Sequence, residues 1–163
     1  MRQAIFVAAT FFFLSCSSPE NAKQVVMQYE IDSLQKVLQN VKPGLGELML
    51  SIQIHHAKLW FAGKNRNWKL ANFEVDEIKE QIEKAMAIET ERPEIKSLPM
   101  INGPLDSVSN TILKGDSTRF ISAYNLLTNT CNNCHKAVNF EFNEVQIPDS
   151  APFSNQVFDN RNK

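Results

Sequence analysis

Residues 115–136 read GDSTRFISAYNLLTNTCNNCHK, and they say more about the architecture than any other part of the chain. Gly115 is suited to ending a preceding helix, and Asp116 or Ser117 can cap a new one. Apolar side chains and possible ligands then recur at helical spacing. This inner stripe comprises Phe120, Ile121, Tyr124, Leu127, Cys131, Cys134 and His135. The segment therefore predicts a long amphipathic helix that carries two thiols and an imidazole on its inner side.

Three further helices are predicted between residue 45 and this segment. Helical apolar stripes run over residues 45–63 and 67–87, and a shorter one runs over 104–113. Three prolines make residues 91–104 a long connection. With only five Gly among 163 residues, the chain disfavours a β-sandwich or barrel with many turns. We therefore expect an all-α protein.

The segments that flank this region have their own character. Residues 16–23 are polar and contain Pro19, which predicts a tether, and a helix is expected over 24–41. The apolar stripe of that helix is short for an isolated coiled coil, so the helix should dock on the domain or on a second copy. Residues 141–163 contain prolines but also phenylalanines, so we expect an ordered coil packed on the domain.

The N-terminus has the pattern of an export signal. One basic residue, Arg2, precedes an apolar stretch over 4–14 that is too short to span a bilayer. Ser15 and Cys16 close it, which resembles a bacterial lipoprotein signal over residues 1–15 that is cleaved to leave Cys16 lipidated. An ordinary secretory signal with an incidental cysteine is the alternative. Either way we expect the cell envelope of a bacterium, on the periplasmic side, with a lipid anchor as the membrane contact.

Charge and cysteine count exclude several classes of function. The chain has 17 basic and 18 acidic residues and no basic patch, so nucleic-acid binding is not expected. Apart from Cys16, the cysteines are Cys131 and Cys134, which is too few for a disulfide framework.

Residues 131–135, Cys-Asn-Asn-Cys-His, form a CxxCH motif, the attachment signature of c-type haem. Two thiols on one helical turn can add to the two vinyl groups of a haem. The adjacent His135 then lies beneath the iron as an axial ligand. The motif predicts one covalent haem c, bound by Cys131 and Cys134 with His135 as proximal ligand.

Two other interpretations of the thiol pair are weaker. A redox dithiol is usually surrounded by a βαβ pattern, and none is predicted here. Half of a zinc site would need a second cysteine pair, and the remaining histidines lie in a distant helix.

The late position of CxxCH, with the Gly115-Asp116 turn and the helix carrying Phe120 and Tyr124, resembles the class II c-type cytochromes, the cytochrome c′ family. The resemblance covers roughly residues 44–140 and is most specific in the last helix. It implies a four-helix bundle around one haem. The N-terminal helix and the C-terminal coil of this chain are additions to that pattern. It also implies that the first bundle helix faces the second side of the iron.

Three side chains of that first helix compete for the sixth position on the iron. Met49 lies in its second turn and shares the apolar face with His56, about 10 Å further along the axis. Only one of them can reach the iron, so Met49 is the candidate ligand, His56 is the alternative, and an unligated face is the third possibility. His55 should lie at the edge of that face, and either His55 or Lys58 could hydrogen-bond a haem propionate.

The function expected from these features is electron transfer to a redox partner protein or a component of an electron-transport chain. The alternative is a five-coordinate haem that binds a diatomic gas, NO or CO. An enzyme is not expected, because His55 and His56 alone offer little distal acid–base chemistry. The resemblance also implies a possible homodimer, since bundles of this family often pair through their first helices.

Overall fold

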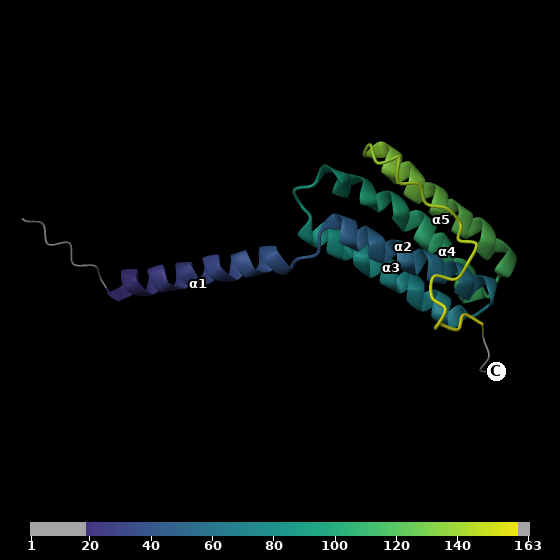
Figure 1. Cartoon of the computed structure of the whole chain (residues 1–163), viewed down its shortest axis with the longest axis horizontal. Helices are drawn as coiled ribbons and strands as arrows, with labels where there is room; N and C mark the ends of the chain where they lie inside the picture. Colours follow the sequence, from purple (N-terminus) through teal and green to yellow (C-terminus); the bar gives the residue numbers. More distant parts are fainter. Residues whose placement is uncertain (1–18, 160–163) are drawn as a thin grey trace, which may run out of the picture. The chain divides into compact units, whose positions relative to one another are not determined.

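The computed structural model describes residues 19–159, and within this range every regular element is a helix (Figure 1). The predicted all-α class is confirmed. The elements are α1 (Pro19–Val41), α2 (Leu45–Lys64), α3 (Trp68–Ile88), the 3-10 helix η1 (Pro93–Ile101), α4 (Asn102–Lys114) and α5 (Ser117–Ala137). The chain divides into two units between Lys42 and Pro43. The export signal, with Cys16, lies outside the described residues.

Helix α1 belongs to the first unit and begins at Pro19 rather than at the expected residue 24. Residues 19–23, within the segment expected to be a tether, are therefore helical. A proline is tolerated at the first helical position, because its missing N–H would have no intrahelical partner there. Glu20 adds a carboxylate to the first turn, where it interacts favourably with the helix dipole.

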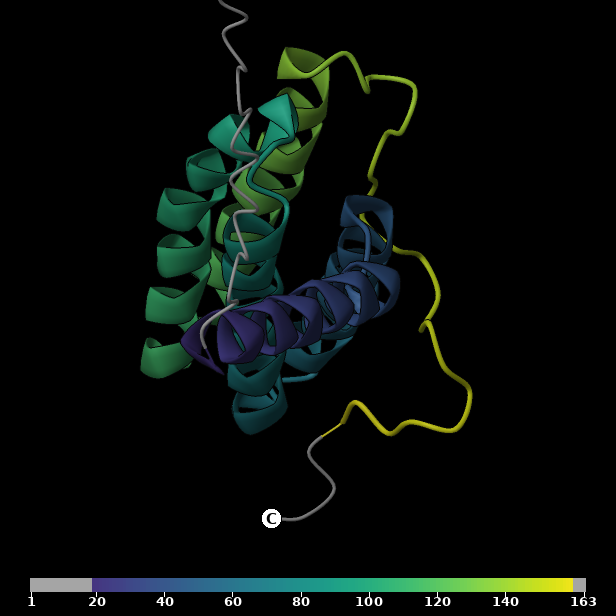
Figure 2. The same cartoon turned by 90° about the vertical axis from the view of Figure 1, so that its left-hand side faces the viewer.

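The second unit is a helical bundle built from two hairpins (Figures 1 and 2). The short turn between α2 and α3 ends at Asn67, whose side chain accepts a hydrogen bond from the Leu70 N–H and caps α3. The turn between α4 and α5 contains Gly115 at φ 62°, a left-handed conformation that glycine adopts without strain. Asp116 then caps α5 by accepting from the Arg119 N–H at 3.0 Å.

One hydrophobic core holds α2, α3, α4, α5 and η1 together. Its aromatic centre lies between α2 and α5, where Trp60 packs on Tyr124 with ring centroids 4.9 Å apart. The predicted stripes supply most of the core, including Leu48, Ile52, Val75, Ile78, Leu105, Val108, Phe120 and Leu127.

The connection between α3 and α4 has more structure than a plain loop. It contains η1, and Leu98 and Ile101 of this element are buried in the core. Pro93 stands at the start of η1, where its missing N–H costs nothing. Helix α4 then begins at Asn102, two residues before the predicted start at residue 104.

The coil after α5 runs along one side of the bundle (Figure 2). Ile147 packs against the core, and the Phe158 side chain is buried beside Phe61 of α2, with ring centroids 5.7 Å apart. Phe142 and Phe153 are instead exposed. The coil is thus attached to the bundle at particular side chains rather than along its whole length.

Candidate haem-attachment site

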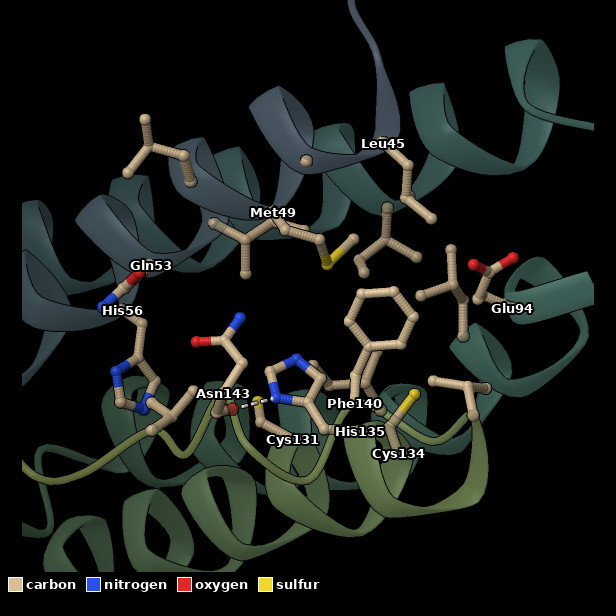
Figure 3. Close-up of a pocket in the computed structure, with 18 of the residues that line it drawn as sticks. Leu45, Met49, Gln53, His56, Glu94, Cys131, Cys134, His135, Phe140 and Asn143 are labelled. Atoms are coloured by element: carbon tan, nitrogen blue, oxygen red, sulfur yellow. Dashed lines mark hydrogen bonds between the residues drawn. The ribbon is translucent and has the colours of Figure 1, made fainter. Parts of the chain in front are cut away.

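A cavity of about 400 Å³ opens between the first turns of α2, η1, the end of α5 and the coil that follows (Figure 3). This volume lies in the range of small-molecule sites. Its lining is mainly apolar and includes Leu45, Met49, Ile52, Ile82, Leu98, Ile101, Val138 and Phe140. The cavity is also lined by the three residues of the CxxCH motif that were predicted to hold a haem, which are Cys131, Cys134 and His135.

Cys131, Cys134 and His135 form one wall of the cavity, because α5 continues as a helix through Ala137. Figure 3 shows both sulfur atoms and the imidazole ring on that wall. Both thiols are free. Burial, with a smaller effect from Cys134, raises the pKa of Cys131 to about 12, and burial also raises the pKa of Cys134. The thiols are therefore neutral near pH 7.

The His135 ring is oriented by the coil. Its Nδ1 lies 2.6 Å from the backbone carbonyl oxygen of Asn143, and a carbonyl can only accept, so Nδ1 carries the proton. In the neutral ring Nε2 is then the nitrogen that keeps a lone pair available to a metal. Figure 3 shows this nitrogen pointing into the cavity, toward the side formed by α2.

Met49 lies on the opposite wall, where its thioether sulfur points into the cavity (Figure 3). It is partly buried and packs against the core, so its position follows from the predicted inner stripe of α2. The ring of Phe140, from the coil, also stands in the cavity. The structure thus brings Met49 and the CxxCH motif together around one space.

His56 lines the same cavity, but both of its ring nitrogens are in hydrogen bonds. The Thr128 hydroxyl donates to the Tyr124 carbonyl, so Nε2 of His56 must donate to Thr128 Oγ1 at 2.9 Å. Nδ1 then accepts from the Tyr124 hydroxyl at 2.9 Å, and the single proton of that hydroxyl is shared with the His56 carbonyl oxygen at 2.8 Å. Burial lowers the pKa of His56 to about 4, so the ring is neutral. Neither nitrogen keeps a lone pair for a metal.

His55 and Lys58 are not among the residues that line the cavity. They face α3, where the fully buried Glu74 carboxylate lies between them. Glu74 Oε2 is 2.7 Å from His55 Nδ1, and Oε1 is 2.7 Å from Lys58 Nζ as an ion contact without hydrogen-bond geometry. A buried carboxylate must be paired, and its two partners are drawn toward it.

Several residues of the site were not found from the sequence. Arg92 and Glu94 line the cavity as an ion pair, with Nη2 and Oε1 2.8 Å apart. Asn143 lies in an irregular segment, where no periodicity marks a functional position. Glu74 could have been noticed, since it is a charged residue at a helical apolar position between Ala71 and Ile78.

Among residues 19–159, no three side chains of His, Cys, Asp or Glu gather in a way that could bind a metal ion. No helix in this range is both long enough and apolar enough to cross a bilayer. Comparisons with protein-family models, with curated proteins and with solved structures give no match to this chain.

Proposed function

We propose that this protein is an exported c-type cytochrome, with a bundle of the cytochrome c′ type, that carries electrons in a bacterial cell envelope. One observation carries the proposal: both CxxCH thiols and an unprotonated His135 nitrogen face a single apolar cavity with a Met thioether opposite. The residues present fit a covalent haem c, because the donor types are those that haem iron and its vinyl groups require.

The haem, when bound, supplies one-electron chemistry at its iron. The residues of this chain provide its attachment and its environment. Cys131 and Cys134 supply the sulfur atoms of the two thioether bonds, and His135 supplies Nε2 as the proximal ligand. The mainly apolar lining would lower the polarity around the haem, which is one of the factors that set its reduction potential.

Met49 is the proposed sixth ligand. Its sulfur already faces the cavity, and the two ring nitrogens of the alternative, His56, are both in hydrogen bonds. A Met thioether opposite histidine favours ferrous iron and raises the potential relative to two histidines. With both axial positions filled, the iron would suit electron transfer better than the capture of a gas.

The test begins with covalent attachment. The double variant Cys131→Ala, Cys134→Ala, expressed with haem maturation machinery, should lose all haem staining on a denaturing gel. Retained staining, or a wild-type protein that never stains, would contradict the proposal.

The optical spectrum then tests the axial ligands. Met49→Ala should convert a low-spin spectrum to a high-spin one and open the iron to carbon monoxide, while His56→Gln should leave a low-spin spectrum. High-spin His56→Gln would instead assign the sixth position to His56. A high-spin wild type that binds carbon monoxide readily would replace electron transfer with gas binding.

The membrane anchor is a separate part of the proposal. Cys16→Ser should move the protein from the membrane fraction to the soluble fraction, because it removes the thiol to which the lipid would be attached. Ser17→Ala, the change at the next residue, should leave the distribution as it is. If the wild type is already soluble, simple secretion replaces lipidation.

A further inference from the structure

The coil that follows α5 turns back on the last turns of that helix. Asn139 adopts φ 62°, and the Phe140 N–H donates to the His135 carbonyl at 2.8 Å, which closes the helix end. The next residues of the coil then lie beside the CxxCH motif. Asn143 and Val145 of the coil both line the cavity.

Asn132, the residue after the first cysteine of the motif, binds this coil through both ends of its side-chain amide. Its Nδ2 donates to the Val145 carbonyl at 2.8 Å, and its Oδ1 accepts from the Val145 N–H at 2.8 Å. A two-point bond of this kind fixes the peptide in orientation as well as in distance. Asn132 is partly buried, whereas the adjacent Asn133 is exposed.

Asn143 lies two residues before Val145 in the same coil, and its carbonyl oxygen is the group that receives the His135 Nδ1 proton at 2.6 Å. Because the carbonyl belongs to the backbone, no side chain of its own determines its position. The position of the oxygen depends on where the coil is held. The Asn143 N–H donates to the Phe140 carbonyl at 3.0 Å, and the Asn132 amide holds the coil at two points two residues further on.

We propose that Asn132 is a positioning residue for the proximal ligand, acting through the coil to hold the Asn143 carbonyl against His135. This inference rests on the proposed function and deepens it. Such an acceptor fixes the tautomer and rotation of the ring and raises the basicity of the nitrogen that binds the metal. Stronger donation stabilises ferric iron, so the attachment keeps the reduction potential lower than a free imidazole would.

The experiment compares Asn132→Ala with Asn133→Ala in the full-length, haem-loaded protein. The two changes are chemically identical, and both fall between the two cysteines. Haem content is measured as the pyridine haemochrome, the midpoint potential by redox titration, and the exchange of the His135 Nδ1 proton with deuterium by NMR.

Asn132→Ala should raise the potential and speed the exchange about tenfold, the factor expected when the hydrogen bond from His135 to the Asn143 carbonyl is lost. Asn133→Ala should match the wild type in both measurements. If Asn132→Ala loads haem and also matches the wild type, the positioning role is overturned while the proposed function stands. If the wild type carries no covalent haem, the two proposals fall together.

A second variant guards against failed maturation of Asn132→Ala. Val145→Pro removes the N–H that donates to Asn132 Oδ1, and it leaves the attachment motif intact. It should shift the potential and the exchange rate in the same directions. A potential that stays at the wild-type value in Val145→Pro would overturn the proposal.

Discussion

Two buried polar side chains of the bundle, His56 and Glu74, meet partners that come from other helices. His56 of α2 is hydrogen-bonded to Tyr124 and Thr128 of α5 and stacks on the Tyr124 ring, with centroids 4.5 Å apart. Glu74 of α3 meets His55 and Lys58 of α2. Each of these two groups therefore ties two helices together, and removing one partner leaves the other without compensation.

The free energy of unfolding should decrease as the pH is lowered, because of His56. Its pKa is about 4 in the folded protein and near 6.5 when unfolded, so between these values the unfolded chain binds more protons. Stability from this group is complete above pH 6.5 and is lost as the pH falls toward 4, by about 3 kcal/mol. Urea unfolding of wild type and His56→Gln across this range measures it. Parallel pH profiles for the two proteins would contradict the assignment.

The Glu74 carboxylate should matter far more than an exposed one. Glu74→Gln keeps the shape but leaves Lys58, which is mostly buried, without its counter-charge. We expect the free energy of unfolding to fall by about 3 kcal/mol. The matched control is Glu80→Gln, which breaks the exposed pair with Lys84 and should cost no more than about 0.5 kcal/mol. Equal losses in the two variants would show that the buried pair has no special weight.

At the scale of the helices, a glycine of α2 leaves room for an aromatic ring of α5. Gly63 is buried in the last turn of α2, and the ring of Phe120 lies directly where a side chain at position 63 would be. The contact admits the aromatic cluster of Trp60, Phe120 and Tyr124 between the helices. A glycine weakens a helix, so its cost here is offset by this packing.

Gly63→Ala should therefore destabilise the protein although alanine is the better helix former. The added methyl group forces the Phe120 ring to move, and overpacking of this kind costs about 1–3 kcal/mol. Gly103→Ala in α4 is the control, since nothing lies within 4 Å of the added carbon, and it should hold or raise stability. Thermal melts of both variants test this prediction. A Gly63→Ala protein as stable as the wild type would contradict the close contact between position 63 and the Phe120 ring.

At the scale of the second unit, the bundle and the C-terminal coil form one packed structure. The coil covers one side of the bundle, is held by Phe158 at one point and by the Asn132 amide at another, and completes the wall of the cavity. The site consequently combines a rigid helical part with an irregular part. The helices carry the thiols and Met49, and the coil supplies the acceptor for His135.

Phe158→Ala should test the attachment of the coil. This side chain is 7% exposed, and losing it from its contact with Phe61 should cost about 3 kcal/mol. Phe142→Ala removes the same group from a side chain that is 80% exposed and should change stability by less than about 0.5 kcal/mol. Chemical denaturation measures the free energy of unfolding of both variants. If the coil is not packed on the bundle, the two variants should lose equally little stability.

Sequence periodicity determined the helices and their inner faces, because the spacing of side chains around a helix is set locally. It therefore predicted the all-α class, the inward position of Met49 and the stripe of α5 except for Ile121, which is exposed. The bounds were less accurate at α1 and α4, where prolines that were taken as breaks stand in the first turn of a helix.

The partners of each inner face were decided by the tertiary structure. His55 and His56 are adjacent in the chain, yet one meets Glu74 of α3 and the other Thr128 of α5. The helix that packs against a given face is determined by contacts between segments that are distant in the sequence. A local sequence pattern does not specify these contacts. The Asn143 carbonyl is the clearest case, because every residue has a carbonyl and only the returning coil brings this one to His135.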